Sequence, residues 1–222
     1  MRARVHWPLL VGLFAMSAFA VAPAGDASAA TVTVAKDRDG YNAVYYVAAP
    51  GEVNDVVVAA FRESRVRIFD AGATISVEGR CRSIDPHRAV CPSFAQIAHV
   101  AVGDLNDRVR ALARGPQFAE PESIFNGGPG DDELLAAGEF DRLFGGAGND
   151  QLHGRDGGDK LDGGEGADRL YGGGNRDRLN GGGGHDELFG GGGSAAGIRI
   201  GLTTRPSAEA GSCTTSTTPS AA

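Results

Sequence analysis

Hydrophobic residues follow two different patterns along this 222-residue chain. Between residues 31 and 125 they gather in short runs rich in valine, isoleucine and aromatic residues, which are typical of β-strands. From residue 127 to 193 a single leucine recurs at every ninth position, in sequence that is otherwise rich in glycine and charge. The first pattern predicts β-structure, and the second requires a search for an internal repeat.

Six strands are expected in the first part, separated by turn signals such as "DRDG", "APGE" and "DAG". They could form a small sandwich or a cap on a solenoid. The cluster of Asp37, Asp39 and Gly40 lacks the alternating ligands and distal glutamate of an EF-hand, so it is interpreted as a hairpin turn. The six runs are "TVTVA", "NAVYYVA", "DVVVAAF", "RVRIF", "ATISV" and "IAHVAV".

The second part divides into seven units of nine residues, starting at Gly127. They are "GGPGDDELL", "AAGEFDRLF", "GGAGNDQLH", "GRDGGDKLD", "GGEGADRLY", "GGGNRDRLN" and "GGGGHDELF", followed by an incomplete "GGGGSA". Position six is aspartate in every unit: Asp132, Asp141, Asp150, Asp159, Asp168, Asp177 and Asp186. Position eight is always leucine: Leu134, Leu143, Leu152, Leu161, Leu170, Leu179 and Leu188.

This nonapeptide resembles the RTX family, also called haemolysin-type calcium-binding repeats. The resemblance implies an all-β chain in which a strand-rich N-terminal region leads into a right-handed parallel β-roll. In that family the first six residues of a repeat form a turn and the last three form a short strand, so two repeats complete one coil. A weaker version of the turn is "GDLND" at residues 103 to 107.

Calcium prefers six to eight oxygen ligands, and a glycine-rich turn exposes its carbonyls and adds one carboxylate. Since successive turns alternate between the sides of the roll, a turn shares its ion with the next turn but one along the chain. The resemblance therefore implies metal ligation by the seven position-six aspartates. It also implies ligation at the glycine positions of the intact turns: Gly127, Gly128, Gly130, Gly145, Gly146, Gly148, Gly163, Gly164, Gly166, Gly181, Gly182 and Gly184.

The repeats differ by face of the roll. Odd-numbered repeats keep glycine at positions one, two and four, which predicts shared sites between Asp132 and Asp150, Asp150 and Asp168, and Asp168 and Asp186. Even-numbered repeats lose some of these glycines, so the sites of Asp141 with Asp159 and of Asp159 with Asp177 are expected to be weaker. The alternative is that these losses matter little, because carbonyls do most of the coordination.

Folding of the repeats is expected to require calcium. Stacked aspartates repel one another until a cation lies between them. One leucine per nine residues contributes about 2 kcal/mol, whereas ordering each residue costs about 1 to 2 kcal/mol. Metal binding and folding are therefore expected to be one event.

Charge and composition restrict the partners. The formal net charge is -7, and the repeats carry 14 acidic and 6 basic residues together with 24 of the 35 glycines. Such an acidic segment argues against nucleic acid and favours calcium ions as the partner. A protein or surface partner of the N-terminal region is not indicated.

The expected organisation begins with a cleaved signal peptide over residues 1–29, where Arg2 and Arg4 precede an apolar run and "ASAA" offers a cleavage site. A membrane anchor is the alternative, but the run is short for a span and is interrupted by Pro8 and Gly12. A β-rich region over 30–125, the repeats over 126–193 and a disordered tail over 194–222 follow. No membrane span is expected in the mature chain, and the location is secreted and extracellular.

Cys81 and Cys91 are spaced to close a small loop, with Pro86 at its turn, and a disulfide fits an oxidising compartment. Two unrelated thiols are the alternative, and Cys213 has no evident partner.

The predicted function is therefore that of a secreted calcium-binding protein whose repeats fold on binding the metal. The alternative is a surface adhesion or structural module, or less plausibly a non-catalytic part of an RTX hydrolase or toxin. No HExxH helix, GxSxG elbow or nucleophile with a base occurs between residues 31 and 125, so no enzyme is expected.

Overall fold

The computed structural model describes residues 29–37, 40–61, 65–92, 97–112, 122–137, 140–191 and 214–216. The predicted signal peptide lies outside these residues except for its last position, and so does most of the predicted tail. All regular structure in the described part is β-strand, which confirms the all-β fold class. No helix there could span a membrane.

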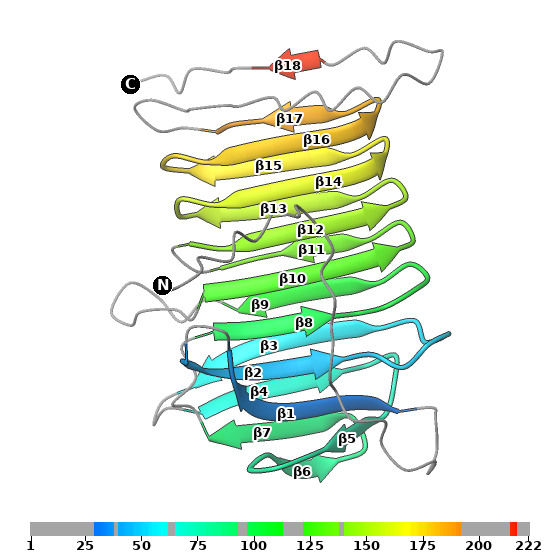
Figure 1. The fold of residues 1–222 in the computed structure, drawn as a ribbon, viewed down its shortest axis with the longest axis vertical. Helices are drawn as coiled ribbons and strands as arrows, with labels where there is room; N and C mark the ends of the chain where they lie inside the picture. Colours follow the sequence, from blue (N-terminus) through cyan, green and yellow to red (C-terminus); the bar gives the residue numbers. More distant parts are fainter. Residues whose placement is uncertain are drawn as a thin grey trace, which may run out of the picture.

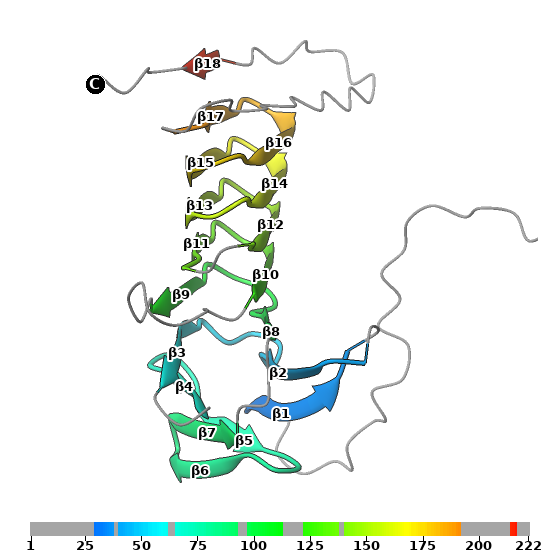
Figure 2. The ribbon, with the colours of Figure 1, turned by 90° about the vertical axis from the view of Figure 1, so that its left-hand side faces the viewer.

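Two sheets face each other along the length of the molecule (Figures 1 and 2). The first sheet contains eight strands in the order β16-β14-β12-β10-β8-β2-β1-β5. The bounds are β1 (Ala30–Lys36), β2 (Asn42–Val47), β5 (Ile75–Val77), β8 (Ile97–Ala101), β10 (Glu122–Pro129), β12 (Arg142–Ala147), β14 (Lys160–Gly166) and β16 (Arg178–Gly184).

The second sheet contains ten strands in the order β18-β17-β15-β13-β11-β9-β3-β4-β7-β6. The bounds are β3 (Asp55–Phe61), β4 (Arg65–Asp70), β6 (Arg82–Asp85), β7 (Arg88–Pro92), β9 (Arg108–Leu112), β11 (Glu133–Leu135), β13 (Gln151–Asp156), β15 (Arg169–Gly174), β17 (Glu187–Phe189) and β18 (Thr214–Ser216).

The repeats wind as expected, with two nonapeptides in each coil. Each repeat strand pairs in parallel with the next repeat strand but one, so that Leu134 aligns with Leu152 and Leu143 with Leu161. Alternate residues of a strand point to opposite faces, and position eight therefore points inward in every coil. All seven repeat leucines are at most 2% exposed.

Both sheets continue from the repeats into the N-terminal region without a break. Parallel pairing runs from β10 to β8 and on to β2 in the first sheet, and from β11 to β9 and on to β3 in the second. One buried cluster includes Val44 and Ile68 of the N-terminal strands together with Leu188 of the last repeat. Of the two arrangements left open by the sequence, the N-terminal region is thus a cap on a solenoid.

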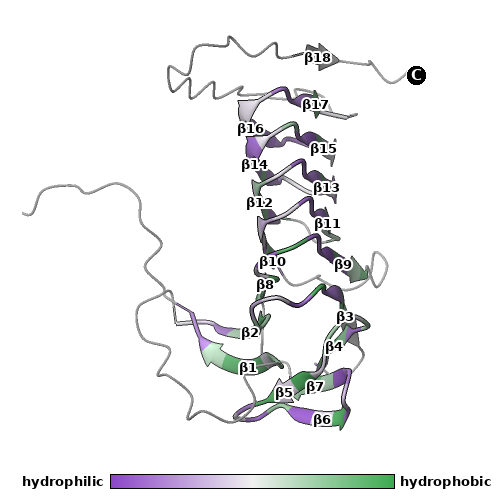
Figure 3. Cartoon of the chain, turned by 90° about the vertical axis from the view of Figure 1, so that its right-hand side faces the viewer, coloured by the Kyte–Doolittle hydropathy of each residue, from purple (hydrophilic) through white to green (hydrophobic). Residues whose placement is uncertain are grey.

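The six strands expected in the N-terminal region are present as β1 to β5 and β8. Hydrophobic residues are denser in these strands than in β14 to β16. Figure 3 shows β14 to β16 mostly in white and purple, the colours of weakly hydrophobic and hydrophilic residues. The turn after Asp37 is a hairpin between β1 and β2, as predicted: the Tyr41 amide donates to the Asp37 carboxylate, 2.8 Å away.

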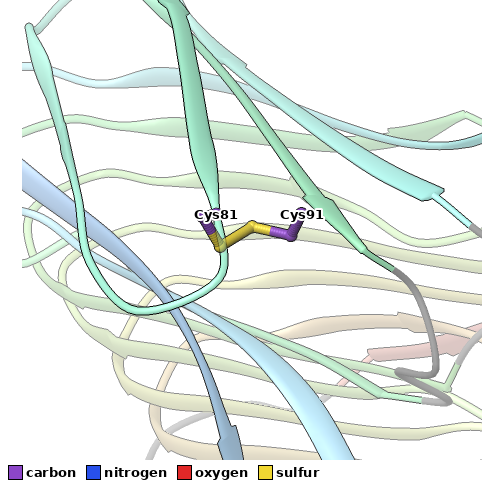
Figure 4. The surroundings of a disulfide bond; sticks show 2 residues. All are labelled: Cys81 and Cys91. Atoms are coloured by element: carbon purple, nitrogen blue, oxygen red, sulfur yellow. A yellow bond between two sulfur atoms is a disulfide. The ribbon is translucent and has the colours of Figure 1, made fainter.

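Four strands that lie in or begin in this region were not expected: β6, β7, β9 and β10, the last of which continues into the first repeat. The disulfide between Cys81 and Cys91 is confirmed, but the residues that it encloses form the β6-β7 hairpin rather than a simple loop (Figure 4). Burial alternates along β7, and Ala89 and Cys91 are both fully buried. The sequence did not predict this strand, because the alternation is short and lies among charged residues.

A short strand also occurs in the segment that the sequence predicts to be disordered. β18 pairs in parallel with β17, aligning Thr215 with Leu188. The edge of the second sheet offers unpaired backbone groups, and these favour the addition of a strand even where the local sequence predicts none.

Candidate metal centre

The predicted ligands gather in two stacks of turns, one along each side of the two sheets. The odd turns, residues 127–132, 145–150, 163–168 and 181–186, lead from the first sheet to the second. The even turns, residues 136–141, 154–159 and 172–177, lead back. Every turn ends at the aspartate of position six, so the aspartates form one column on each side.

Hydrogen bonds connect each column. The backbone amide of one aspartate donates to Oδ1 of the next aspartate in its column, at 2.8 Å from Asp132 to Asp150 and from Asp150 to Asp168. The bond from Asp168 to Asp186 measures 3.1 Å. The even column has the same bonds, at 2.8 Å from Asp141 to Asp159 and 3.0 Å from Asp159 to Asp177. The partnership of alternate turns predicted from the sequence is thereby confirmed as a spatial pairing.

The second carboxylate oxygen is what sets these aspartates apart from ordinary structural ones. Their side chains are at most 7% exposed. Oδ2 is buried and has no hydrogen-bond partner among the described residues in Asp132, Asp150, Asp159, Asp168 and Asp177. A buried carboxylate oxygen without a partner is costly, and a bound cation would remove that cost.

Glycine at position one gives this oxygen its space. A Cβ added to Gly127 would lie 2.1 Å from Oδ2 of Asp132, and one added to Gly145 would lie 2.2 Å from Oδ2 of Asp150. Gly163 and Gly181 stand in the same relation to Asp168 and Asp186, at 2.2 and 2.3 Å. A side chain at any of these four glycines would displace the carboxylate of its turn.

Glycines at positions two and four let the backbone of one turn lie close to the carbonyl oxygens of the preceding turn on the same side. Gly128, Gly146, Gly164 and Gly182 have φ between +99° and +127°, and Gly130, Gly148, Gly166 and Gly184 have φ between +124° and +145°. A Cβ on Gly146 would lie 2.0 Å from the carbonyl oxygen of Gly128, and one on Gly148 would lie 2.0 Å from that of Gly130. Only glycine permits both the dihedral angle and the approach.

Comparison with known proteins decides what these turns are. Residues 126–161 and 162–194 match the family model described as RTX calcium-binding nonapeptide repeat. Residues 126–194 are RTX calcium-binding repeats. No curated protein and no solved structure matched the chain. The RTX repeats bind calcium, and the chain therefore carries a calcium-binding β-roll.

The donor set of the RTX turns suits calcium. No group of three or more His, Cys, Asp or Glu side chains within the described residues could hold a metal on its own. Five of the seven turns instead offer a buried carboxylate oxygen that has no hydrogen-bond partner among the described residues. Hard oxygen donors of this kind suit calcium better than zinc or copper. A site needs two neighbouring turns to complete its oxygen shell.

Each of the three even turns of the RTX segment departs from this geometry. Ala136 occupies position one beside Asp141, where Gly154 and Gly172 leave room for the carboxylates of their turns. Arg155 at position two has φ +74°, and Asn175 at position four has φ +67° against +124° or more for glycines there. Asparagine tolerates the left-handed region at φ of about +60° but not the larger φ of these glycines. The peptide group at Asn175 is therefore oriented differently from that at a position-four glycine.

Two features of the site were missed by sequence reasoning. Side chains at position five form an outer ladder on the odd side, in which the Asn149 amide donates to Asp131 at 2.7 Å and the Ala167 amide to Asn149 at 2.9 Å. Asn and Asp recur at this position among other residue types, which made the signal too irregular to recognise. Gly154 and Gly172 were also omitted, although a Cβ there would lie 2.5 and 2.4 Å from Oδ2 of Asp159 and Asp177.

Burial raises the pKa of the column aspartates well above the ordinary value. The pKa rises to about 6 for Asp132 and Asp150, and to about 7 for Asp159 and Asp168. Loss of hydration is the main cause, repulsion from neighbouring aspartates adds to it, and the hydrogen bond from the backbone amide acts in the opposite direction. When no cation is present, these carboxylates therefore keep a proton up to a higher pH than an ordinary aspartate does.

Without calcium, the roll is therefore expected to be more stable at about pH 5 than at about pH 8. The folded-state pKa is raised, so this contribution to stability is complete below the unfolded pKa of about 3.8 and is lost as pH rises through 6 to 7. Far-ultraviolet circular dichroism of calcium-free protein at the two pH values provides the measurement, with more β-sheet signal expected at about pH 5. With saturating calcium the trend should reverse, because protons then compete with the ion. Equal β-sheet signals in calcium-free protein would contradict the expectation.

Proposed function

We propose that this is a secreted calcium-binding protein whose RTX repeats fold into a β-roll when the metal binds outside the cell. The observation that carries the proposal is the row of buried Oδ2 atoms in Asp132, Asp150 and Asp168, which have no hydrogen-bond partner within the described part of the chain. Each lies near a backbone carbonyl of the next odd turn. Bound calcium would neutralise the negative charge of these oxygens. It would also join each odd turn to the next odd turn along the roll. No catalytic role is included in the proposal.

The odd turns would hold three ions, between Asp132 and Asp150, Asp150 and Asp168, and Asp168 and Asp186. Their carbonyl contribution would come from the glycines at positions one, two and four of those turns. The even turns would bind more weakly, because Ala136, Arg155 and Asn175 disturb the approach of neighbouring turns. Asp159 and Asp177 keep the buried-oxygen arrangement, so their pair is the better even site.

The two sides of the roll can be compared with a pair of matched substitutions. Asp150→Asn should weaken calcium binding by more than about tenfold, because loss of an outer-shell partner of a metal ligand already costs about that much and this carboxylate itself serves two intact odd-side sites. Asp159→Asn, which makes the same chemical change in an even turn, should weaken binding less. Isothermal titration calorimetry gives the affinities and the number of ions. Equal losses in the two variants would remove the distinction between the sides, and absence of saturable binding at millimolar calcium in the unaltered protein would refute the function.

Secretion is supported by the apolar segment with a small-residue cleavage site near the N-terminus and by the disulfide between Cys81 and Cys91. Disulfides persist in oxidising compartments, where free calcium is also plentiful. Cell fractionation with N-terminal sequencing of the exported protein tests this part. Retention at the cell surface would instead favour an adhesive or structural role.

A further inference from the structure

One turn outside the RTX match has the geometry of a repeat turn. Residues 102–107 connect β8 in the first sheet to β9 in the second, on the odd side of the roll. Strand pairing aligns Arg108 with Glu133 and Val109 with Leu134. Asp107 therefore falls at position six, directly beside Asp132, although the two aspartates lie further apart along the chain than two nonapeptides.

Asp107 shares the unusual state of the repeat aspartates. It is 4% exposed, and its backbone amide donates to Oδ1 of Asp132 at 2.8 Å, the distance found between consecutive repeats. Its own Oδ1 accepts from the Asn54 amide at 2.7 Å. Its Oδ2 is buried and has no hydrogen-bond partner in the described part of the chain.

Backbone carbonyls of this turn approach the first repeat as closely as repeats approach one another. A Cβ on Gly128 would lie 2.0 Å from the carbonyl oxygen of Gly103, and one on Gly130 would lie 1.7 Å from that of Leu105. The corresponding distances from Gly146 and Gly148 to the first repeat are both 2.0 Å. The carbonyl stack is therefore continuous across the limit of the family match, although Leu105 occupies position four with φ +76°.

The outer ladder of position five continues as well. The Asp131 amide donates to Oδ1 of Asn106 at 2.9 Å, in the manner of Asn149 with Asp131 one coil further on. The buried carboxylate and the outer ladder thus reproduce the contact between two repeats. Val102 at position one and Leu105 at position four depart from the glycine pattern as the even turns do, so this site is expected to be weaker than those between odd repeats.

We propose that the turn over residues 102–107 and the first RTX turn over residues 127–132 hold a further calcium ion. Asp107 and Asp132 supply its carboxylates, and the carbonyls of Gly103 and Leu105 face it. The proposal rests on calcium binding by the repeats, as set out above. This ion would join the N-terminal cap to the repeats, so that the cap offers a preformed first turn on which the roll assembles.

The column of charged residues ends at Asp107. Asn54 occupies the next place and donates to Asp107 through its backbone, but its side chain carries no charge and its Oδ1 accepts from the Tyr46 hydroxyl at 2.8 Å. An ion between Asn54 and Asp107 would have a single carboxylate. The odd side is therefore expected to hold four ions, counting the three sites within the repeats.

Asp107→Asn tests the extra site, and Asn54 shows that asparagine fits in this column. The variant keeps Oδ1 as an acceptor and removes only the charge. We expect it to bind one calcium ion fewer per molecule than the unaltered protein, measured by calorimetry on the full chain. Asp104→Asn is the matched control. Asp104 lies in the same turn, and its carboxylate accepts a hydrogen bond from the Gly51 amide at 2.7 Å. Because the residue at position three varies among the repeats, this variant should bind as many calcium ions as the unaltered protein.

The outcomes separate this proposal from the function on which it rests. An unchanged number of ions in Asp107→Asn overturns the extra site and leaves the repeat sites standing. No calcium uptake by the unaltered protein overturns the proposed function itself. If Asp107→Asn does not fold, crystals of the unaltered protein grown in calcium decide by anomalous scattering. A peak between Asp107 and Asp132 supports the site, and peaks between Asp132 and Asp150 without one there overturn it.

Discussion

Chelation of calcium is expected to remove most of the β-sheet circular dichroism signal of the repeats and to leave the N-terminal cap folded. The repeats bury five carboxylate oxygens that have no partner among the described residues, and their hydrophobic core is a single leucine per repeat strand. The cap is different, because it buries Tyr46 and Ile68 among several valines and has a disulfide. Metal-dependent folding should therefore be confined to β10 and the strands that follow it.

Hydrogen exchange resolves the two parts of the chain. In chelator, amides of β12 to β17 should exchange rapidly, while those of β1 to β4 stay protected. Millimolar calcium should restore protection to the repeats. Magnesium is the control ion and should not substitute for calcium, because it demands a smaller octahedral shell and gives up water reluctantly. Protection of the repeats that is the same in chelator and in calcium would refute coupled folding.

Gly146→Ala is expected to be among the most damaging single methyl additions in the repeats. Gly146 has φ +127°, and its new Cβ would lie 2.0 Å from the carbonyl oxygen of Gly128. Left-handed backbone costs an alanine about 1 to 2 kcal/mol, and separating the turns adds to this. The turn also serves two calcium sites, so affinity at both should fall. Thermal unfolding in calcium and calorimetry measure the two effects, with a loss of at least about 2 kcal/mol expected.

Gly158→Ala is the matched control. Gly158 lies at position five of an even turn, its φ is not in the left-handed region, and the closest atom to an added Cβ is a ring carbon of Phe140 at 3.2 Å. A side-chain ring can move by a few tenths of an ångström, so stability and calcium binding should be close to those of the unaltered protein. Equal damage from both variants would show that turn glycines matter for flexibility rather than for the approach of carbonyls.

Much of the metal centre could be predicted because the repeat is strict. The nonapeptide period puts Asp150 and Asp168 in equivalent places, and parallel pairing of alternate repeat strands then follows from two repeats per coil. The turn at 102–107 was recognised only as a weak variant, since Leu105 replaces glycine and the distance along the chain from Asp107 to Asp132 is not a multiple of the repeat. Spacing fails as a guide where an insertion lies between two coils that are adjacent in space.

The sequence by itself determined the elements that local chemistry dictates: the strands at six hydrophobic runs, the inward leucines, the Cys81–Cys91 bridge and the aspartates of the calcium-binding turns. Only the tertiary structure decided that the N-terminal strands extend the same two sheets and that Asp107 joins the column of aspartates. It also decided that Oδ1 of each aspartate is hydrogen-bonded, while Oδ2 of most is buried with no partner among the residues that the structure describes. The physical reason is that periodicity records which residues are equivalent within a repeat, whereas contacts between coils depend on distances across the stack that the order of residues does not contain.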